Sequence, residues 1–215
     1  ERGVVPVDDA RLDPLWTQAG RLELPVLIHV GDLHANFEPL DARNERYEFL
    51  SANKALAYHG WTDTPSLEVI LSQFERVLAR HPETTFILAH LGHRTDDLRE
   101  AGAMLDRHPN LFMDISARVQ ELGRQPHTAR AFFLRYQDRL VFGTDGNPGP
   151  EVYRDHFRFL ETADEYFDYP FWPMFNYGRW KIFGVDLPDE VLRKLYHDNT
   201  AKILGLPLLT ETHRR

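Results

Sequence analysis

Three apolar, strand-like segments of this chain each end on a residue that can bind a metal ion or move a proton. The segment LPVLIH ends at His29, TTFILAH ends at His90, and RLVFGTD ends at Asp145. In parallel α/β folds, the loops at the carboxyl ends of the strands form the pocket that carries the chemistry. Because two histidines and one aspartate occupy this position in three segments, we expect them to share one site.

The segments between these strand ends have the apolar spacing of helices. A helix, a tight turn and a strand that is apolar on both sides recur along the chain, which predicts a parallel sheet covered by helices. The expected strands are 26–28, 85–89, 111–115 and 139–143, and the expected helices are 13–22, 64–81, 96–107, 126–136 and one that begins near Pro188.

Composition limits the class of protein and the kind of site. The 215 residues are 42% hydrophobic, enough for one domain, 1–215, with a sizeable core. No apolar run reaches the length of a membrane span and no leader pattern follows Glu1, so we expect a cytoplasmic protein without a membrane partner. The net charge of −8 argues against nucleic-acid binding. Because the chain has no cysteine, any metal here needs His, Asp or Glu ligands.

Two longer and less regular stretches follow strand ends and carry many aromatic side chains. They are residues 31–64 and 146–188, and the second contains an aromatic-rich segment at 167–180. A barrel places its substrate-binding loops at these positions. The aromatic side chains would therefore either line a substrate pocket or pack a local core of their own.

Four motifs and the C-terminal segment resemble the amidohydrolase-related metal-dependent hydrolases, also called amidohydrolase family 2. The motifs are IHVGD around His29, FILAHLG around His90, MDISAR around Asp114 and VFGTDGNP around Asp145. The closing LPDEVLRKLYHDNTAKILGL is similar to the family's terminal helical segment, and the similarity covers about residues 7–206. The resemblance implies a TIM-like (β/α)8 barrel with a divalent metal at its carboxyl face, zinc or, as the alternative, manganese.

The resemblance also implies a role for each strand-end residue. His29 would be the metal ligand that ends the fifth barrel strand. His90, ending the sixth, and Asp145, ending the eighth, would bind the metal and take part in catalysis. Asp114, on the seventh, would support the site without binding the metal. Because a carboxylate beside a metal-bound water can accept its proton, Asp145 would act as base and then as acid.

The chain departs from the family in one respect. The family's first strand carries a His-x-His pair, and this sequence contains no such pair. We therefore expect the chain to hold only about strands 5 to 8, the C-terminal portion of the barrel. An uncovered strand edge presents unpaired backbone groups, so we expect association into a homo-oligomer. A chain without the pair could alternatively be an inactive fragment or a binding module.

Three further residues are candidates for binding the substrate. Arg118 lies just past the seventh strand and suits a carboxylate bound by two hydrogen bonds, although a neighbouring acidic side chain could pair with it instead. His93 and Asp32 follow His90 and His29 closely enough to line the mouth of the pocket.

Two reactions on a small molecule fit these residues. The leading hypothesis is a metal-dependent hydrolase that cleaves a C–N or C–O bond of an amide, ester or lactone through a metal-activated water. The alternative is a carbon–carbon lyase, which the same family also contains, performing non-oxidative decarboxylation of an aromatic or unsaturated carboxylic acid. Arg118 and the aromatic segment fit a planar anion and an ester nearly equally well, so the sequence leaves both open.

Overall fold

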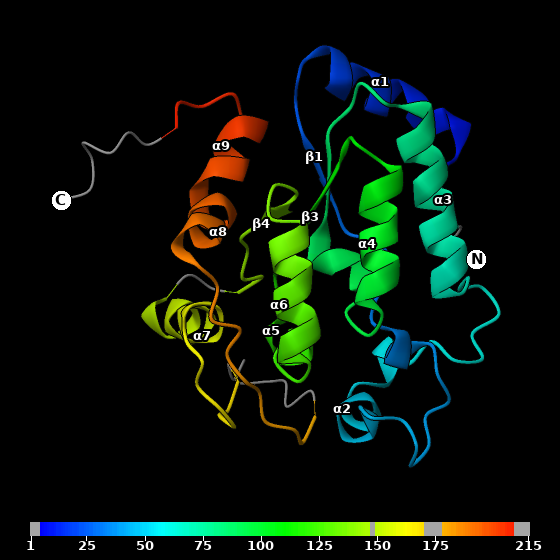
Figure 1. The fold of residues 1–215 in the computed structure, drawn as a ribbon. Coiled ribbons are helices and arrows are strands. Elements are labelled where there is room, and N and C mark those ends of the chain that lie inside the picture. Colours follow the sequence, from blue (N-terminus) through cyan, green and yellow to red (C-terminus); the bar gives the residue numbers. More distant parts are fainter. Residues whose placement is uncertain (1–4, 147–148, 170–177, 209–215) are drawn as a thin grey trace.

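The computed structural model describes residues 5–146, 149–169 and 178–208, and its centre is a four-stranded parallel sheet (Figure 1). The strands lie in chain order, β1-β2-β3-β4, and each pairs with the next. Parallel neighbours require crossover connections, and helices supply them here. The strands are β1 (Val26–Ile28), β2 (Phe86–Leu88), β3 (Leu111–Asp114) and β4 (Leu140–Val141).

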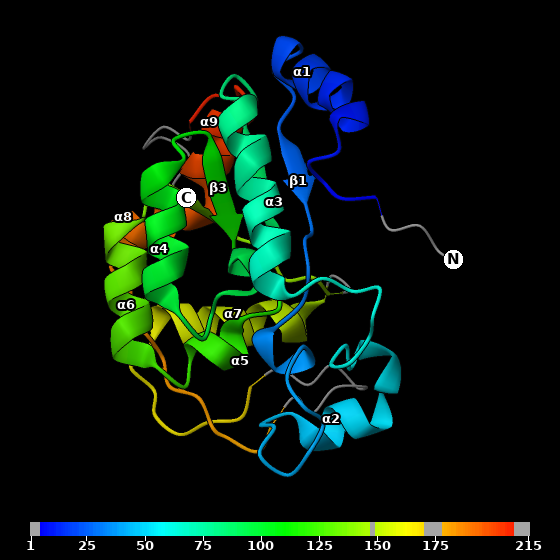
Figure 2. The same ribbon diagram turned by 90° about the vertical axis from the view of Figure 1, so that its right-hand side faces the viewer.

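Helices α3, α4 and α6 lie side by side over one face of the sheet, while α2 and α5 lie beyond the carboxyl ends of the strands (Figures 1 and 2). No helix in the described part of the chain is long and apolar enough to cross a membrane. The helices are α1 (Asp13–Arg21), α2 (Tyr47–Ala52), α3 (Leu67–Arg80), α4 (Leu98–Arg107), α5 (Val119–Leu122), α6 (Pro126–Arg135), α7 (Pro150–Glu161), α8 (Asp189–Arg193) and α9 (Asn199–Ile203). Short 3-10 turns cover Ala10–Leu12, His34–Asn36, Lys54–Leu56 and Ala89–His93, and a π turn covers Lys194–Asp198.

The core lies between the sheet and these helices. Phe86 of β2 is fully buried and meets Trp16 of α1 and Phe74 of α3 edge-on, with ring centroids 5.9 Å and 5.7 Å away. Aromatic pairs in this geometry add about 0.5–1.5 kcal/mol each to the burial of their apolar area. They fix β2, the strand that leads to His90, against two helices from different parts of the chain.

Within the described residues, no helix covers the opposite face of the sheet (Figures 1 and 2). Leu27, Ile87 and Phe112 pair in register across β1, β2 and β3, and Leu27 is 65% exposed. Because alternate residues of a strand face opposite sides, this row corresponds to the interior of a closed barrel. Four strands in chain order with helices on one face form a partial (β/α)8 barrel, which confirms the expected fold.

Several elements differ from the sequence-based expectation: strand β4 covers only Leu140–Val141, and helices α2 and α5 were not expected. Helix α3 begins at Leu67, after the Thr-Pro pair expected to start it, because the hydroxyl of Ser66 caps the helix by accepting the N–H of Val69 at 3.4 Å. The stretch 146–188 was expected to be irregular, but it contains the 12-residue helix α7. Residues 170–177 of the aromatic segment lie outside the described residues.

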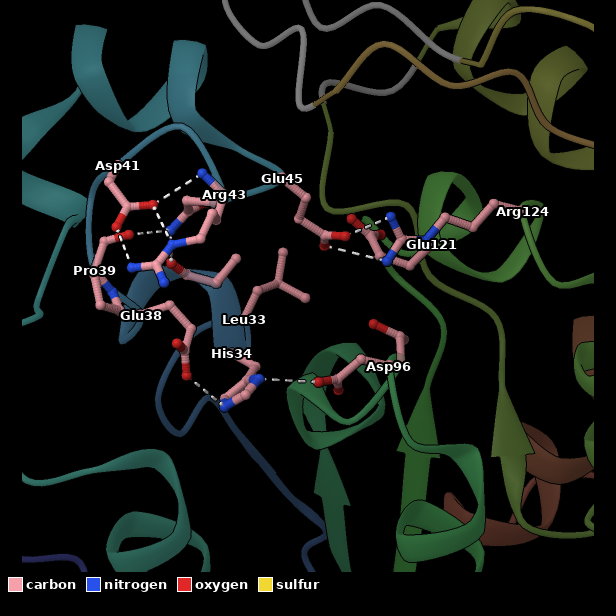
Figure 3. A pocket seen from close by; sticks show the side chains of 13 residues that line it. Leu33, His34, Glu38, Pro39, Asp41, Arg43, Glu45, Asp96, Glu121 and Arg124 are labelled. Atoms are coloured by element: carbon pink, nitrogen blue, oxygen red, sulfur yellow. Dashed lines mark hydrogen bonds and ion pairs between the residues drawn. The ribbon is translucent and has the colours of Figure 1, made fainter.

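A cavity of about 550 Å³ lies where the chain after β1 meets the loops that follow β2 and β3 (Figure 3). Figure 3 shows His34 between Glu38 and Asp96, at 3.2 Å and 3.4 Å, and Arg124 paired with Glu45 at 2.8 Å. The cavity is lined by Leu33, His34, Ala35, Glu38, Pro39, Asp41, Arg43, Asn44, Glu45, Thr95, Asp96, Glu121 and Arg124. None of His29, His90 and His93 belongs to this lining.

Replacing His156 with asparagine should make the protein less sensitive to acid. Burial lowers the pKa of His156, and the hydrogen bond from its Nδ1 to the Val152 carbonyl at 2.8 Å only partly opposes this. An unfolded chain protonates this histidine near pH 6.5, so stability falls as the pH drops below that value, towards the lower folded pKa. Asparagine keeps a donor near the Nδ1 position and does not titrate.

Urea unfolding at pH 7 and pH 5 checks this prediction. The loss of unfolding free energy between the two values should be smaller in His156→Asn than in the native chain. His127→Asn, at an exposed position of α6, is the control and should leave the loss unchanged. An equal loss in His156→Asn and the native chain would contradict the prediction.

Candidate functional site

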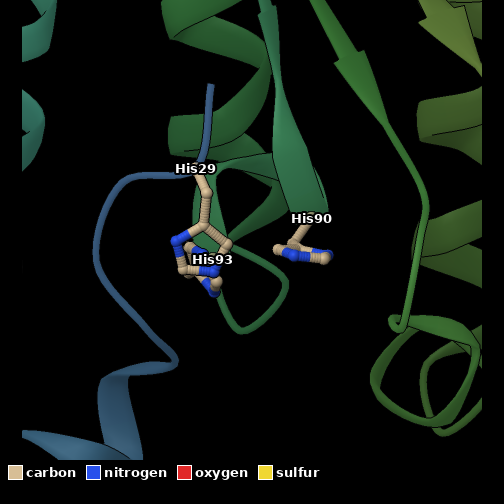
Figure 4. A group of neighbouring side chains, drawn as sticks. All are labelled: His29, His90 and His93. Carbon is tan, nitrogen blue, oxygen red and sulfur yellow. The ribbon is translucent and has the colours of Figure 1, made fainter. Parts of the chain in front are cut away.

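Three histidine rings meet at the carboxyl ends of β1 and β2 (Figure 4). The ring centroids are 5.0 Å apart for His29 and His90, 4.9 Å for His29 and His93, and 5.1 Å for His90 and His93. One ring nitrogen from each lies within 4.8 Å of the others. Among the described residues, no other group of three histidine, aspartate or glutamate side chains converges in this way.

A run of left-handed backbone brings His93 beside His90. The φ angle is +60° at His90, +53° at Leu91, +62° at Gly92 and +59° at His93. This conformation costs about 1–2 kcal/mol at each residue that has a Cβ, and such strain concentrates at functional sites. A Cβ at Gly92 would lie 2.7 Å from Cδ2 of Leu88, so any other residue there would add a displacement of the Leu88 side chain to the strain of a positive φ.

Asp114, the last residue of β3, holds this turn in place. Its Oδ1 accepts the backbone N–H of His90 at 2.8 Å, the N–H of Ser116 at 2.9 Å and the hydroxyl of Ser116 at 2.5 Å. Hydrogen bonds to an ionised acceptor are stronger than neutral ones, and these stabilise the strained backbone. The sequence analysis did not predict a role for Ser116. A hydroxyl two residues after an aspartate commonly donates a hydrogen bond to that carboxylate, and this pattern was the available signal.

The imidazole of His90 has a defined orientation. Its Nδ1 lies 2.8 Å from the carbonyl oxygen of Ser116, which can only accept, so Nδ1 carries the proton. Nε2 then has a lone pair, and it lies 3.8 Å from Oδ2 of Asp145. Burial and the Arg118 guanidinium lower the pKa of His90, opposed by the Ser116 carbonyl and the carboxylates of Asp114 and Asp145. A neutral imidazole held in this way is the form that binds metals.

Arg118, expected to face a substrate, lies buried against His93. Its Nη2 donates to Nδ1 of His93 at 2.9 Å, and its Nη1 donates to the carbonyl of Ala117. The His93 ring is fully buried, and its Nε2 has no hydrogen-bond partner in the described part of the chain. Burial, with the charge of Arg118 and the two other histidines adding to it, holds the pKa of His93 well below its ordinary value.

The two predicted aspartates take different positions. Asp145 follows β4 with a left-handed φ of +54°, and its side chain is 60% exposed beside His90. Asp32 is half-buried and accepts the hydroxyl of Tyr58 at 2.5 Å; burial, together with this bond, raises the pKa of Tyr58. Tyr58 was not selected from the sequence because it lies 26 residues from Asp32 in a loop without a motif.

The chain is similar to a known protein family in sequence and to several solved structures in fold. The sequence model of the protein family described as Amidohydrolase matches residues 1–206. No curated protein matches the sequence. Solved structures that resemble the chain include a 2,6-dihydroxybenzoate decarboxylase in complex with 2,6-dihydroxybenzoate (15% identity, TM-score 0.52) and the 5-carboxyvanillate decarboxylase of Sphingomonas paucimobilis (12%, 0.51). A third is a dihydroxybenzoic acid decarboxylase from Polaromonas sp. JS666 with bound manganese and the inhibitor 2-nitroresorcinol (14%, 0.55).

These likenesses cover nearly all of this chain and part of each neighbour. They include 95%, 94% and 100% of this chain, but 58%, 56% and 59% of the respective neighbours. The chain thus spans less than three fifths of the length of the solved structures it matches. At identities of 12–15%, the likeness establishes the shared barrel fold.

Replacing Asp114 with alanine should destabilise the protein by about 2–4 kcal/mol, because three hydrogen-bond donors, including two backbone N–H groups, lose their shared acceptor. Urea unfolding followed by circular dichroism measures the change. Asp63→Ala is the matched control, since Asp63 is exposed and accepts only a 3.4 Å bond from Thr62, and it should change stability by less than about 0.5 kcal/mol. Equal stability of the two variants would show that Asp114 does not hold the turn.

Proposed function

The chain belongs to the amidohydrolase family, whose members are metal-dependent enzymes, and we propose that it acts on a small aromatic carboxylic acid by non-oxidative decarboxylation. The observation that supports a metal-dependent reaction is the approach of His29 to His90 at the carboxyl edge of the sheet, with Asp145 beside His90. The decarboxylases among the structural neighbours support the choice of reaction by analogy of fold.

The side chains at this edge fit a divalent metal ion. His90 presents a lone pair on Nε2, Oδ2 of Asp145 lies 3.8 Å from it, and a ring nitrogen of His29 lies within 4.8 Å of one on His90. Ligand atoms with bonds of about 2.0–2.2 Å to one ion lie roughly 3–4 Å apart, and the His90–Asp145 pair already has this separation. We assign the metal to His29, His90 and Asp145. Zinc suits the nitrogen ligands, and manganese, which one neighbour holds, is the alternative.

When bound, the ion would polarise an oxygen of the substrate and lower the pKa of a coordinated water. Asp145, exposed beside His90, would deliver a proton to the ring carbon that carries the carboxylate. The bond between that carbon and the carboxylate then breaks, carbon dioxide leaves, and the bonding electrons restore the aromatic ring. Asp145 regains its proton from water.

Hydrolysis of an amide, ester or lactone is the second candidate function. The same placement of Asp145 favours it, because an exposed carboxylate beside His90 can take a proton from water. The charge of Arg118, which lies directly behind His93, favours an anionic substrate and therefore decarboxylation.

The purified chain should bind a divalent metal, and alanine at His29 or His90 should weaken that binding at least about tenfold, because each removes one nitrogen ligand. Mass-spectrometric metal analysis after dialysis, reported separately for zinc and manganese, measures the content. His127→Ala on α6 is the control and should retain the metal of the native chain. If all variants hold the same amount of metal, the assignment is wrong.

Incubation with a panel of dihydroxybenzoates should release carbon dioxide, while esters, lactones and amides should remain intact. Asp145→Asn should lower turnover at least about a hundredfold, because an amide does not transfer the proton. Asp138→Asn is the matched control: Asp138 precedes the other end of β4, is 58% exposed and pairs with Lys194. Hydrolysis without carbon dioxide would favour the second candidate, and full turnover by Asp145→Asn would exclude Asp145 as the proton donor.

A further inference from the structure

His93 has no role in the metal assignment, although its ring is as close to His29 and His90 as they are to each other. We propose that Arg118 fixes His93 in the tautomer that carries its proton on Nε2. His93 is then a hydrogen-bond donor to an anionic oxygen of the bound ligand, and not a third metal ligand. The identity of the ligand rests on the proposed function, whereas the tautomer does not.

The contact between Arg118 and His93 determines where the proton lies. A guanidinium has only donors and no lone pair, and it stays protonated throughout the working range of a protein. The Nη2 of Arg118 lies 2.9 Å from Nδ1 of His93, so Nδ1 must supply the lone pair. A doubly protonated ring would place two donors against each other at this distance. The ring is therefore neutral, and its one proton is on Nε2.

The Nε2–H of His93 is a buried hydrogen-bond donor without an acceptor among the described residues. Within the described residues nothing accepts from Nε2, and the residue is fully buried. A buried donor without a partner is unfavourable, and native proteins rarely keep one unless a water or ligand completes it. The same atom is poorly suited to a metal ion, because it has no lone pair while Arg118 occupies Nδ1.

His90 on the same turn is held in the opposite tautomer. Its Nδ1 donates to the carbonyl of Ser116, which leaves the lone pair on Nε2. The left-handed run at 90–93 thus places side by side a ring that can accept or coordinate and a ring that can only donate. Their centroids are 5.1 Å apart, close enough for one small ligand to reach both.

The charge of Arg118 selects the kind of ligand. It lies directly behind the His93 ring, polarises the Nε2–H bond, and makes a second cation at His93 unfavourable. The positive charge of Arg118 stabilises an anionic oxygen bound at this position. A carboxylate or phenolate oxygen of the aromatic acid is the group that fits both the donor and the charge, with its other oxygen free to reach the ion held by His90.

The tautomer is measured on the native 215-residue chain labelled with ¹⁵N-histidine. Long-range ¹H–¹⁵N correlation spectra at pH 7 distinguish the proton positions, and the signals that disappear in His93→Gln identify His93. We expect the Nε2–H tautomer for His93 and the Nδ1–H tautomer for His90. The Nδ1–H tautomer at His93, or rapid exchange between the two forms, would overturn the proposal without bearing on metal binding.

Binding measurements test the role of the proton. Glutamine keeps an N–H donor near the Nε2 position and leucine does not, so 2,6-dihydroxybenzoate should bind about tenfold or more weakly to His93→Leu and nearly normally to His93→Gln. Zinc alone should bind both variants within about threefold of the native chain. Loss of zinc binding in both would make His93 a metal ligand and refute the proposal. If the native chain binds zinc but no dihydroxybenzoate, the proposed substrate class fails, and the tautomer still decides whether His93 is a donor.

Discussion

Oδ1 of Asp114 accepts three hydrogen bonds at the end of β3, and two of them come from backbone N–H groups in different loops. One is the N–H of His90, the first of four consecutive residues with positive φ. Such a run is unfavourable for L residues, so it persists only where neighbouring contacts outweigh its cost. Without this acceptor the turn would relax, and His90 and His93 would lose their common orientation.

The pairing of β2 with β3 and the packing of the core place Asp114 next to the turn at residues 90–93. Parallel pairing sets Leu88 opposite Met113, so the residues that follow the two strands meet across one edge. Burial of Phe86 against Trp16 and Phe74 holds β2 in this register. A slip of one residue would move each side chain of β2 to the other face, exposing Phe86 and separating Asp114 from the turn. The site therefore depends on core packing at the opposite end of the strand.

Much of the fold follows from local sequence patterns. Apolar runs of strand length separated by amphipathic helices are enough to predict four parallel strands and to place His29, His90 and Asp145 at their carboxyl ends. Helix α7 escaped prediction because its buried residues, His156, Phe159 and Leu160, include a histidine in an aromatic-rich stretch. A helical spacing of buried positions is present there, but composition obscures it.

The fine geometry of the site is harder to predict because it depends on contacts between distant residues. Arg118 was expected to face a substrate, and it contacts His93, 25 residues earlier in the chain. That contact requires the left-handed turn at 90–93, and a single sequence gives little indication of such a backbone. The roles of His29, His90 and Asp145 stay predictions, although the structure places His29 and Asp145 beside His90.

The cavity near the histidine cluster has a mainly acidic lining. Its negative charge would repel an anionic substrate. Carboxylates outnumber arginines in its lining, and Arg43 and Arg124 are already paired with Asp41 and Glu45. The buried pair of Arg46 and Glu121 and the contact of His34 with Asp96 join its walls across different loops. These contacts fit a role in holding the 31–64 segment to the loops after β2 and β3.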